Sequence, residues 1–160
     1  MIACRHPIMK KLLTFLATVV LASFFAGCST TGGPRYNAVK DTFPMLAAGT
    51  GRILVYRDAL LNPAKRPAVL LNGEPIGLSK VQEFFYVDQP AGAYKVELSG
   101  EGSPPASFTL SPGQTVYVGI GVHTRIVKTI MINCQYPKVV DATTAQHELL
   151  YCRYTGAAQK

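Results

Sequence analysis

Apolar and polar residues alternate with a period of two along several stretches after Gly51, clearest at 93–98 and 116–122. Side chains of a strand point alternately to its two faces, so this period predicts half-buried strands. Residues 52–57 are apolar on both faces apart from their terminal arginines and predict a central strand. The other expected strands are 68–71, 76–78, 83–87, 106–110, 127–132 and 149–154.

Turn residues separate these stretches every 8–12 residues, as in Asn72-Gly73, Pro90-Ala91-Gly92 and Ser111-Pro112-Gly113. Asn-Gly favours tight hairpins because both residues tolerate positive φ. Seven or eight short strands with this spacing predict an all-β domain over 51–160, a small antiparallel β-sandwich or a barrel. No helix longer than a single turn at 141–147 is expected there.

The first 27 residues follow a different pattern. Arg5, Lys10 and Lys11 precede an uncharged, mostly apolar run of 14 residues, 12–25. A basic start followed by a short apolar run is typical of a secretory signal, here a signal helix, and the run is shorter than the ~20 residues of a membrane span. Met9-Lys10-Lys11 would itself serve as a signal start, so the start codon is open between Met1 and Met9.

The end of the apolar run, Phe25-Ala26-Gly27-Cys28, resembles the lipobox of bacterial lipoproteins, although Leu is commoner than Phe at its first position. The resemblance implies removal of the signal peptide 1–27 and lipid on Cys28. Two or more acyl chains anchor a protein stably. Ser29, rather than Asp, follows the cysteine, which implies a lipid-anchored protein of the cell envelope, at the outer membrane and facing the periplasm.

Residues 28–50 predict a flexible tether, since Ser, Thr, Gly and Pro dominate its start. Phe43, Met45 and Leu46 interrupt that polarity and either fold back onto the domain as a clasp or contact another molecule. Without the three basic signal residues the chain keeps 13 basic and 9 acidic residues, a net charge of +4. These charges are scattered, which speaks against a nucleic-acid partner.

Cys134 and Cys152 remain after lipidation of Cys28 and loss of Cys4, and an even pair in an oxidising compartment predicts a disulfide. A metal site formed by these two cysteines with His123 and His147 is the alternative. Their spacing matches no zinc motif with close ligand pairs, so no metal site is assigned.

No catalytic residue and no cofactor are predicted. A catalytic triad could be assembled from serines with His123, His147, Asp88 and Asp141, as it could in most chains of this length. The chain has no Gly-x-Ser-x-Gly elbow, no His-Glu-x-x-His motif and no phosphate-binding glycine loop. The chain is therefore not expected to be an enzyme.

Phe84-Phe85-Tyr86 offers a candidate interaction surface. Neighbouring side chains face opposite sides of a strand, so Phe84 and Tyr86 lie off the core face unless both faces are covered. Burial of this strand on both sides is the alternative.

Several segments resemble, in order, an uncharacterised family of bacterial lipoproteins, the family of domain of unknown function 2846. They are 51–57, 71–77, 85–87, 90–96 and 111–117, and the span that contains them is about half of the chain after the signal. The resemblance implies a β-sandwich of transthyretin-like or immunoglobulin-like character and brings no catalytic residues.

These observations together predict a non-catalytic protein-interaction or structural accessory module of the envelope. Its expected partners are the membrane, through the lipid anchor, and another envelope protein. A small-ligand or metal-binding periplasmic lipoprotein is the alternative.

Overall fold

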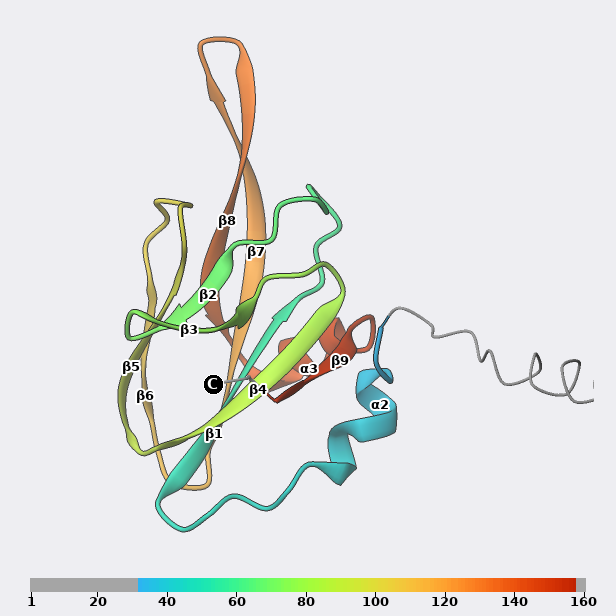
Figure 1. Cartoon of the computed structure of the whole chain (residues 1–160), viewed down its shortest axis with the longest axis vertical. Coiled ribbons are helices and arrows are strands. Elements are labelled where there is room, and N and C mark those ends of the chain that lie inside the picture. The colour runs from blue at the N-terminus through green and yellow to red at the C-terminus, as the bar shows by residue number, and fades with distance from the viewer. Residues whose placement is uncertain (1–31, 158–160) are drawn as a thin grey trace, which may run out of the picture. The chain divides into compact units, whose positions relative to one another are not determined.

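The computed structural model describes residues 32–157, in which two β-sheets pack face to face and short helices cover the outer side of one sheet (Figure 1). The predicted signal peptide 1–27 and the predicted lipidation site Cys28 lie outside the described residues. The strands are β1 (Thr50–Arg57), β2 (Ala68–Leu71), β3 (Glu74–Leu78), β4 (Glu83–Pro90), β5 (Gly92–Leu98), β6 (Ala106–Leu110), β7 (Thr115–Val127), β8 (Ile130–Val140) and β9 (Arg153–Ala157). The helices are α2 (Tyr36–Val39), the 3-10 helix η2 (Lys40–Thr42) and α3 (Ala142–Leu149).

The two sheets differ in strand direction. The five-stranded sheet has the order β8-β7-β1-β4-β9, and the four-stranded sheet has the order β3-β2-β5-β6. All pairs of the four-stranded sheet are antiparallel, whereas β1 runs parallel to β7 and β4 runs parallel to β9. The predicted all-β sandwich is therefore confirmed, and its strands are antiparallel in one sheet and mixed in the other.

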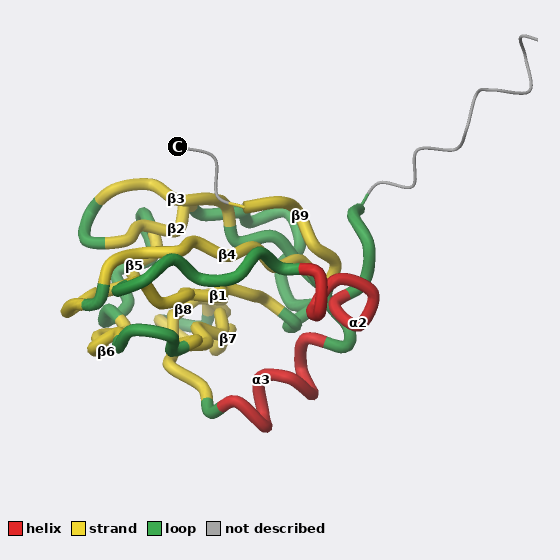
Figure 2. Tube along the Cα trace, turned by 90° about the horizontal axis from the view of Figure 1, so that it is seen from below, coloured by secondary structure: helices red, strands yellow, loops and turns green. Residues whose placement is uncertain are grey.

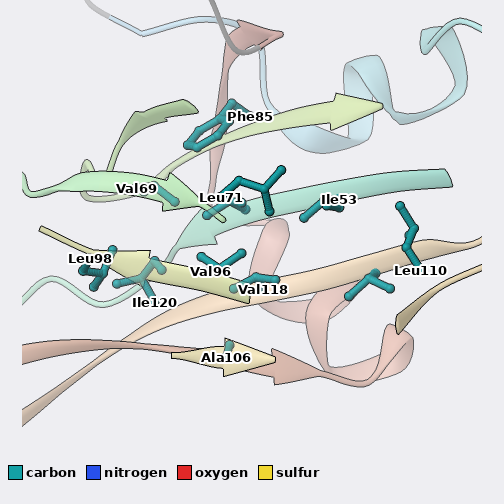
Figure 3. Close-up of a cluster of buried hydrophobic side chains, with 12 residues drawn as sticks. Ile53, Val69, Leu71, Phe85, Val96, Leu98, Ala106, Leu110, Val118 and Ile120 are labelled. Atoms are coloured by element: carbon teal, nitrogen blue, oxygen red, sulfur yellow. The ribbon is translucent and has the colours of Figure 1, made fainter. Parts of the chain in front are cut away.

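Alternation along β1 explains how the five-stranded sheet is buried on both faces. Ile53 and Val55 belong to the core between the sheets, while Leu54 and Tyr56 belong to a second core on the opposite face. The side-chain period of two produces this division. The core between the sheets is shown in Figure 3 and consists of Ile53, Val55, Val69, Leu71, Phe85, Val96, Leu98, Ala106, Leu110, Val116, Val118 and Ile120.

The second core lies under the helices, which Figure 2 shows outside the strand layers. Tyr36 of α2 packs edge-on against Phe84, with ring centroids 5.5 Å apart, and Phe43 packs against both Phe84 and Tyr86. Phe43 therefore folds back as a clasp, as one of the two interpretations of the tether predicted. Met45, by contrast, is 96% exposed.

The N-terminal part of the fold begins earlier than position 51. The Tyr154 N–H donates to the Pro34 carbonyl at 2.8 Å, and the Tyr36 N–H donates to the Cys152 carbonyl at 3.2 Å. The predicted tether boundary at residue 50 is thus wrong, because residues from about 33 onward are hydrogen-bonded to the domain.

Three elements also depart from the sequence pattern. The strand expected at 127–132 is interrupted by a two-residue turn at Lys128 and Thr129, whose φ values are 45° and 68°. The single turn expected at 141–147 is an eight-residue helix, α3. The last strand is β9 rather than 149–154, because α3 extends to Leu149.

Candidate interaction surface on the β7–β8 arm

Cys134 and Cys152 are free thiols at separate places in the fold, so the predicted disulfide is wrong. Cys134 lies in β8, and Cys152 directly precedes β9, at the opposite edge of the five-stranded sheet. Four strand spacings of ~4.8 Å place these edges roughly 19 Å apart, well beyond the ~7 Å that a disulfide bridges. Cys152 is fully buried, and burial raises the pKa of its thiol to about 12.

The four residues considered for a metal site also lie at separate places in the fold. His123 and Cys134 are cross-strand neighbours, whereas His147 lies on α3. No group of three or more His, Cys, Asp or Glu residues in the described part of the chain is arranged to hold a metal ion.

The carboxylates considered for a triad are engaged in structural contacts. Asp88 accepts two hydrogen bonds of 2.7 Å from Arg52, and Asp141 accepts from the Thr144 N–H at the start of α3. His123 and His147 lie near Tyr136 and Tyr151, with ring centroids 5.3 Å and 6.2 Å apart.

Phe84 and Tyr86 do not form an exposed surface. Phe84 is 0% and Tyr86 is 7% exposed, because both point into the second core under Tyr36, Phe43 and Tyr154. Phe85 points to the other face, between the sheets. The prediction that Phe84 and Tyr86 bind a partner is therefore wrong, and burial on both sides, the alternative, is what the structure shows.

A hairpin that projects beyond the sandwich presents the most conspicuous exposed apolar surface. We call this hairpin the arm and define it as residues 123–134, the outer parts of β7 and β8 with their turn (Figure 1). Ile126, Ile130, Met131 and Ile132 are 69%, 65%, 71% and 42% exposed. An isolated two-stranded hairpin is marginally stable in water, and clustered exposed aliphatic residues mark interaction sites.

The net charge of the domain is concentrated on the whole β7–β8 hairpin, residues 115–140, of which the arm is the outer part. Thr115 to Val140 contains Arg125, Lys128 and Lys138 and no acidic residue. The rest of 32–157 contains nine basic and nine acidic residues, so its formal charge is zero. The hairpin thus carries the net +3 of the described residues, which favours an anionic partner.

The base of the arm is fixed by buried polar contacts. Gln135 is 0% exposed; its amide donates to the Lys65 carbonyl at 3.0 Å and its side-chain oxygen accepts from Ser79 at 2.7 Å. Its backbone N–H donates to Glu101, which also pairs with Lys65 at 2.7 Å. Because these buried groups are hydrogen-bonded, they hold β8 firmly where the arm leaves the sandwich.

A shallow hollow of about 420 Å³ lies beside the base of the arm. It is lined by His123, Tyr136 and three prolines, Pro104, Pro105 and Pro137. Tyr136 also covers Gly121, where a Cβ would lie 2.5 Å from the tyrosine ring, so a side chain at 121 would force the ring to shift.

Sequence reasoning missed the arm, although part of its signal is in the sequence. The β-branched run around Lys128-Thr129 predicted one strand, because neither residue is a usual turn former. The absence of acidic residues from 102 to 140 was a usable signal of an unusual surface.

Comparison with protein-family models, with curated proteins and with solved structures finds no match to this chain. Within 32–157, none of the helices has the length and apolar character needed to span a membrane.

Proposed function

We propose that this chain is a lipid-anchored accessory protein of the bacterial envelope that binds another envelope protein through the arm and catalyses no reaction. The observation that carries the proposal is the exposure of Ile126, Ile130, Met131 and Ile132 on a projecting hairpin. The signal-like start and the lipobox-like Cys28 support the anchor. The outer membrane, on its periplasmic side, is the proposed location.

The domain would be held close to the membrane. The Gly33 carbonyl accepts a hydrogen bond of 3.2 Å from Arg153, so the domain includes Gly33, five residues after Cys28. Five residues span at most about 18 Å when fully extended. This is a much shorter reach than a tether of 28–50 would allow, and it favours a partner at or near the same membrane.

Site-specific photo-cross-linking in cells tests the function. A photoreactive amino acid replaces Met131 on the arm of the full-length chain, and Leu60, 64% exposed and outside the arm, serves as the matched control. We expect a discrete cross-linked protein from position 131 and none from position 60. Equal or absent cross-linking at the two positions would contradict the proposal.

The anchor is tested with the same chain. Cys28→Ala should prevent lipidation and release the protein from membranes, and it should weaken cross-linking from position 131 because the protein is no longer concentrated beside its partner. Retention of Cys28→Ala in the membrane fraction would argue against the anchor.

A small-ligand-binding lipoprotein is the second candidate, supported by the hollow of about 420 Å³ beside His123 and Tyr136. Native mass spectrometry of the purified protein distinguishes it, because a co-purifying small molecule that is lost in Tyr136→Ala would favour this function over protein binding.

A further inference from the structure

We infer that the partner contributes an extended segment bearing carboxylates, which pairs with the outer edge of β8 and adds a sixth strand to the five-stranded sheet. This inference rests on the proposed function and specifies how the arm binds. Three features of the arm lead to it: an unprotected strand edge, apolar side chains on both faces, and a positive charge.

The first feature is the edge. β8 ends the five-stranded sheet, and no strand within 32–157 pairs with its outer side. Its pairing with β7 is regular over all eleven pairs, from Tyr117↔Val140 to Val127↔Ile130, without a bulge. Native proteins protect edge strands with charges, prolines or bulges, because the free N–H and C=O groups recruit other strands.

The protection of β8 is confined to the part near the sandwich. Pro137 and Lys138 lie there, whereas residues 130–136, Ile-Met-Ile-Asn-Cys-Gln-Tyr, contain neither a proline nor a charge. Glu101 already accepts the outward N–H of Gln135, so the open edge is residues 130–134, about 17 Å at ~3.3 Å per residue. That length matches an added strand of ordinary size.

The second feature is that both faces of the arm are apolar. Ile126 and Met131 are cross-strand partners and share one face, while Ile130 and Ile132 alternate with Met131 and share the other. An added strand places its own side chains alternately on both faces and so covers both pairs. A partner that docked on one face would leave the other pair exposed.

The third feature, the charge, selects among extended segments. Lys128 and Lys138 attract carboxylates, since no acidic residue of the hairpin neutralises them. A second copy of this chain is disfavoured, because pairing β8 with β8 would bring two such basic sets together. A lipid bilayer is disfavoured because the free edge of β8 and the polar turn at Lys128 would lose hydrogen bonds in hydrocarbon.

Binding of strand-forming peptides tests the inference. The protein is the chain 28–160 with Cys28→Ser, so that any membrane binding reports on the arm and not on lipid. The probes are a ten-residue peptide with four central Val between three Glu at each end, which places Val on both faces of a strand, the same peptide with Lys for Glu, and the Glu peptide with Pro for one central Val. We expect at least tenfold tighter binding of the Glu peptide than of either other peptide, weakened by salt.

Amide hydrogen exchange locates the bound peptide. The amides of Met131 and Asn133 should exchange at least tenfold more slowly in the presence of the Glu peptide, because alternate N–H groups point to the free edge and that of Gln135 is already bonded to Glu101. Lys128→Glu should reduce the affinity several-fold. Lys40→Glu, an exposed change of equal charge outside the arm, should leave it unchanged.

The failures of the two proposals are distinguishable. If Met131 cross-links to an envelope protein but the Glu peptide shows no preference over the Lys peptide, the strand inference is wrong and the proposed function stands. Flotation of the lipid-free chain with anionic vesicles, or a dimer in sedimentation that Lys128→Glu strengthens, would also overturn the strand inference. An absence of cross-linking from position 131 would overturn the proposed function itself.

Discussion

Arg52 shows how much a single side chain contributes to closing the second core. Its guanidinium donates to both Asp88 oxygens at 2.7 Å and to the Pro44 carbonyl at 2.9 Å. It also lies over the rings of Tyr86 and Phe43, at 4.3 Å and 5.3 Å from their centroids. Only the planar fork of arginine makes all these contacts at once.

Arg52→Lys should therefore destabilise the fold by about 2 kcal/mol, because a lysine keeps the charge but loses the paired hydrogen bonds and the ring contacts. Urea unfolding measures the change. Lys95, paired with Glu97 at an exposed site, provides the control, and Lys95→Ala should cost less than ~0.5 kcal/mol. Equal stability of the wild type and Arg52→Lys would show that the Arg52 contacts contribute little.

The two cysteines should differ in reactivity. Cys152 is buried and its pKa is raised to about 12, so at pH 8 its reactive thiolate is scarce as well as inaccessible. Iodoacetamide should label the half-buried Cys134 of the folded protein first and Cys152 only on unfolding, as peptide mass spectrometry would show. If neither thiol reacts, even in the unfolded protein, until a reductant is added, the predicted disulfide between Cys134 and Cys152 would be correct after all.

Two residue-level predictions from the sequence, the disulfide and the aromatic surface, failed for the same reason. The even cysteine count predicted a bond, and adjacent aromatic residues predicted a surface, but both depend on which elements become neighbours in space. Cys152 and Phe84 lie in the same buried cluster, and nothing local in their sequence indicates α2 and α3 as the cover.

At the scale of elements, Asp141 is the N-cap residue that fixes where α3 begins. The Asp141 carboxylate accepts the Thr144 N–H at 3.0 Å, while Ala145 and Leu149, one turn apart, bury the inner face of the helix. This cap lowers the pKa of Asp141. The N-cap pattern was present in the sequence, but the short and mostly polar helix has only a narrow apolar stripe.

Asp141→Ala should lower the melting temperature at pH 7 because α3 loses its cap. The folded-state pKa is below the unfolded value of 3.8, so the stabilisation is present above pH 3.8 and is lost as the pH falls through the folded-state pKa. The difference in melting temperature between wild type and variant should therefore shrink below pH 3.8. A difference that is the same at pH 7 and pH 2.5 would show that the charge of Asp141 does not act.

A substitution in the turn of the arm should stabilise the protein, whereas Asp141→Ala should destabilise it. Lys128 and Thr129 both have positive φ, which is unfavourable for β-branched Thr and favourable for Asn-Gly. Replacing the pair by Asn-Gly should stabilise the arm by about 1 kcal/mol, seen as roughly fivefold slower amide exchange at residues 130–133. Faster exchange in that variant would mean that the turn is not of this type.

At the scale of the whole molecule, the sequence pattern located the strands well and their neighbours poorly. Alternation and turn chemistry placed β2, β5 and β6 almost residue for residue, because these features are local. The parallel pairs β1–β7 and β4–β9 join segments more than 60 residues apart, and no local pattern reports such pairings. The free edge of β8 follows from that order, which is why the proposed binding site was not predictable.

The same long-range packing makes the segment before β1 part of the domain. Tyr36 is buried in the second core, and Phe43 packs against Phe84, Tyr86 and Tyr154. Gly33 lies so close to β9 that a Cβ there would be 1.8 Å from the Tyr154 carbonyl oxygen, so this contact accepts only glycine. The segment therefore acts as a lid on the outer face of the five-stranded sheet.

A chain shortened to begin at residue 50 should consequently be much less stable than one that begins at residue 32. Its Phe84 and Tyr86 would be exposed, each losing part of the ~2–3 kcal/mol that burial of an aromatic side chain contributes. We expect the shorter chain to bind an apolar dye and to have a clearly lower unfolding midpoint, whereas Gly33→Ala should show a milder form of the same defect. Identical unfolding of the chains from 32 and from 50 would return residues 32–49 to the role of a tether.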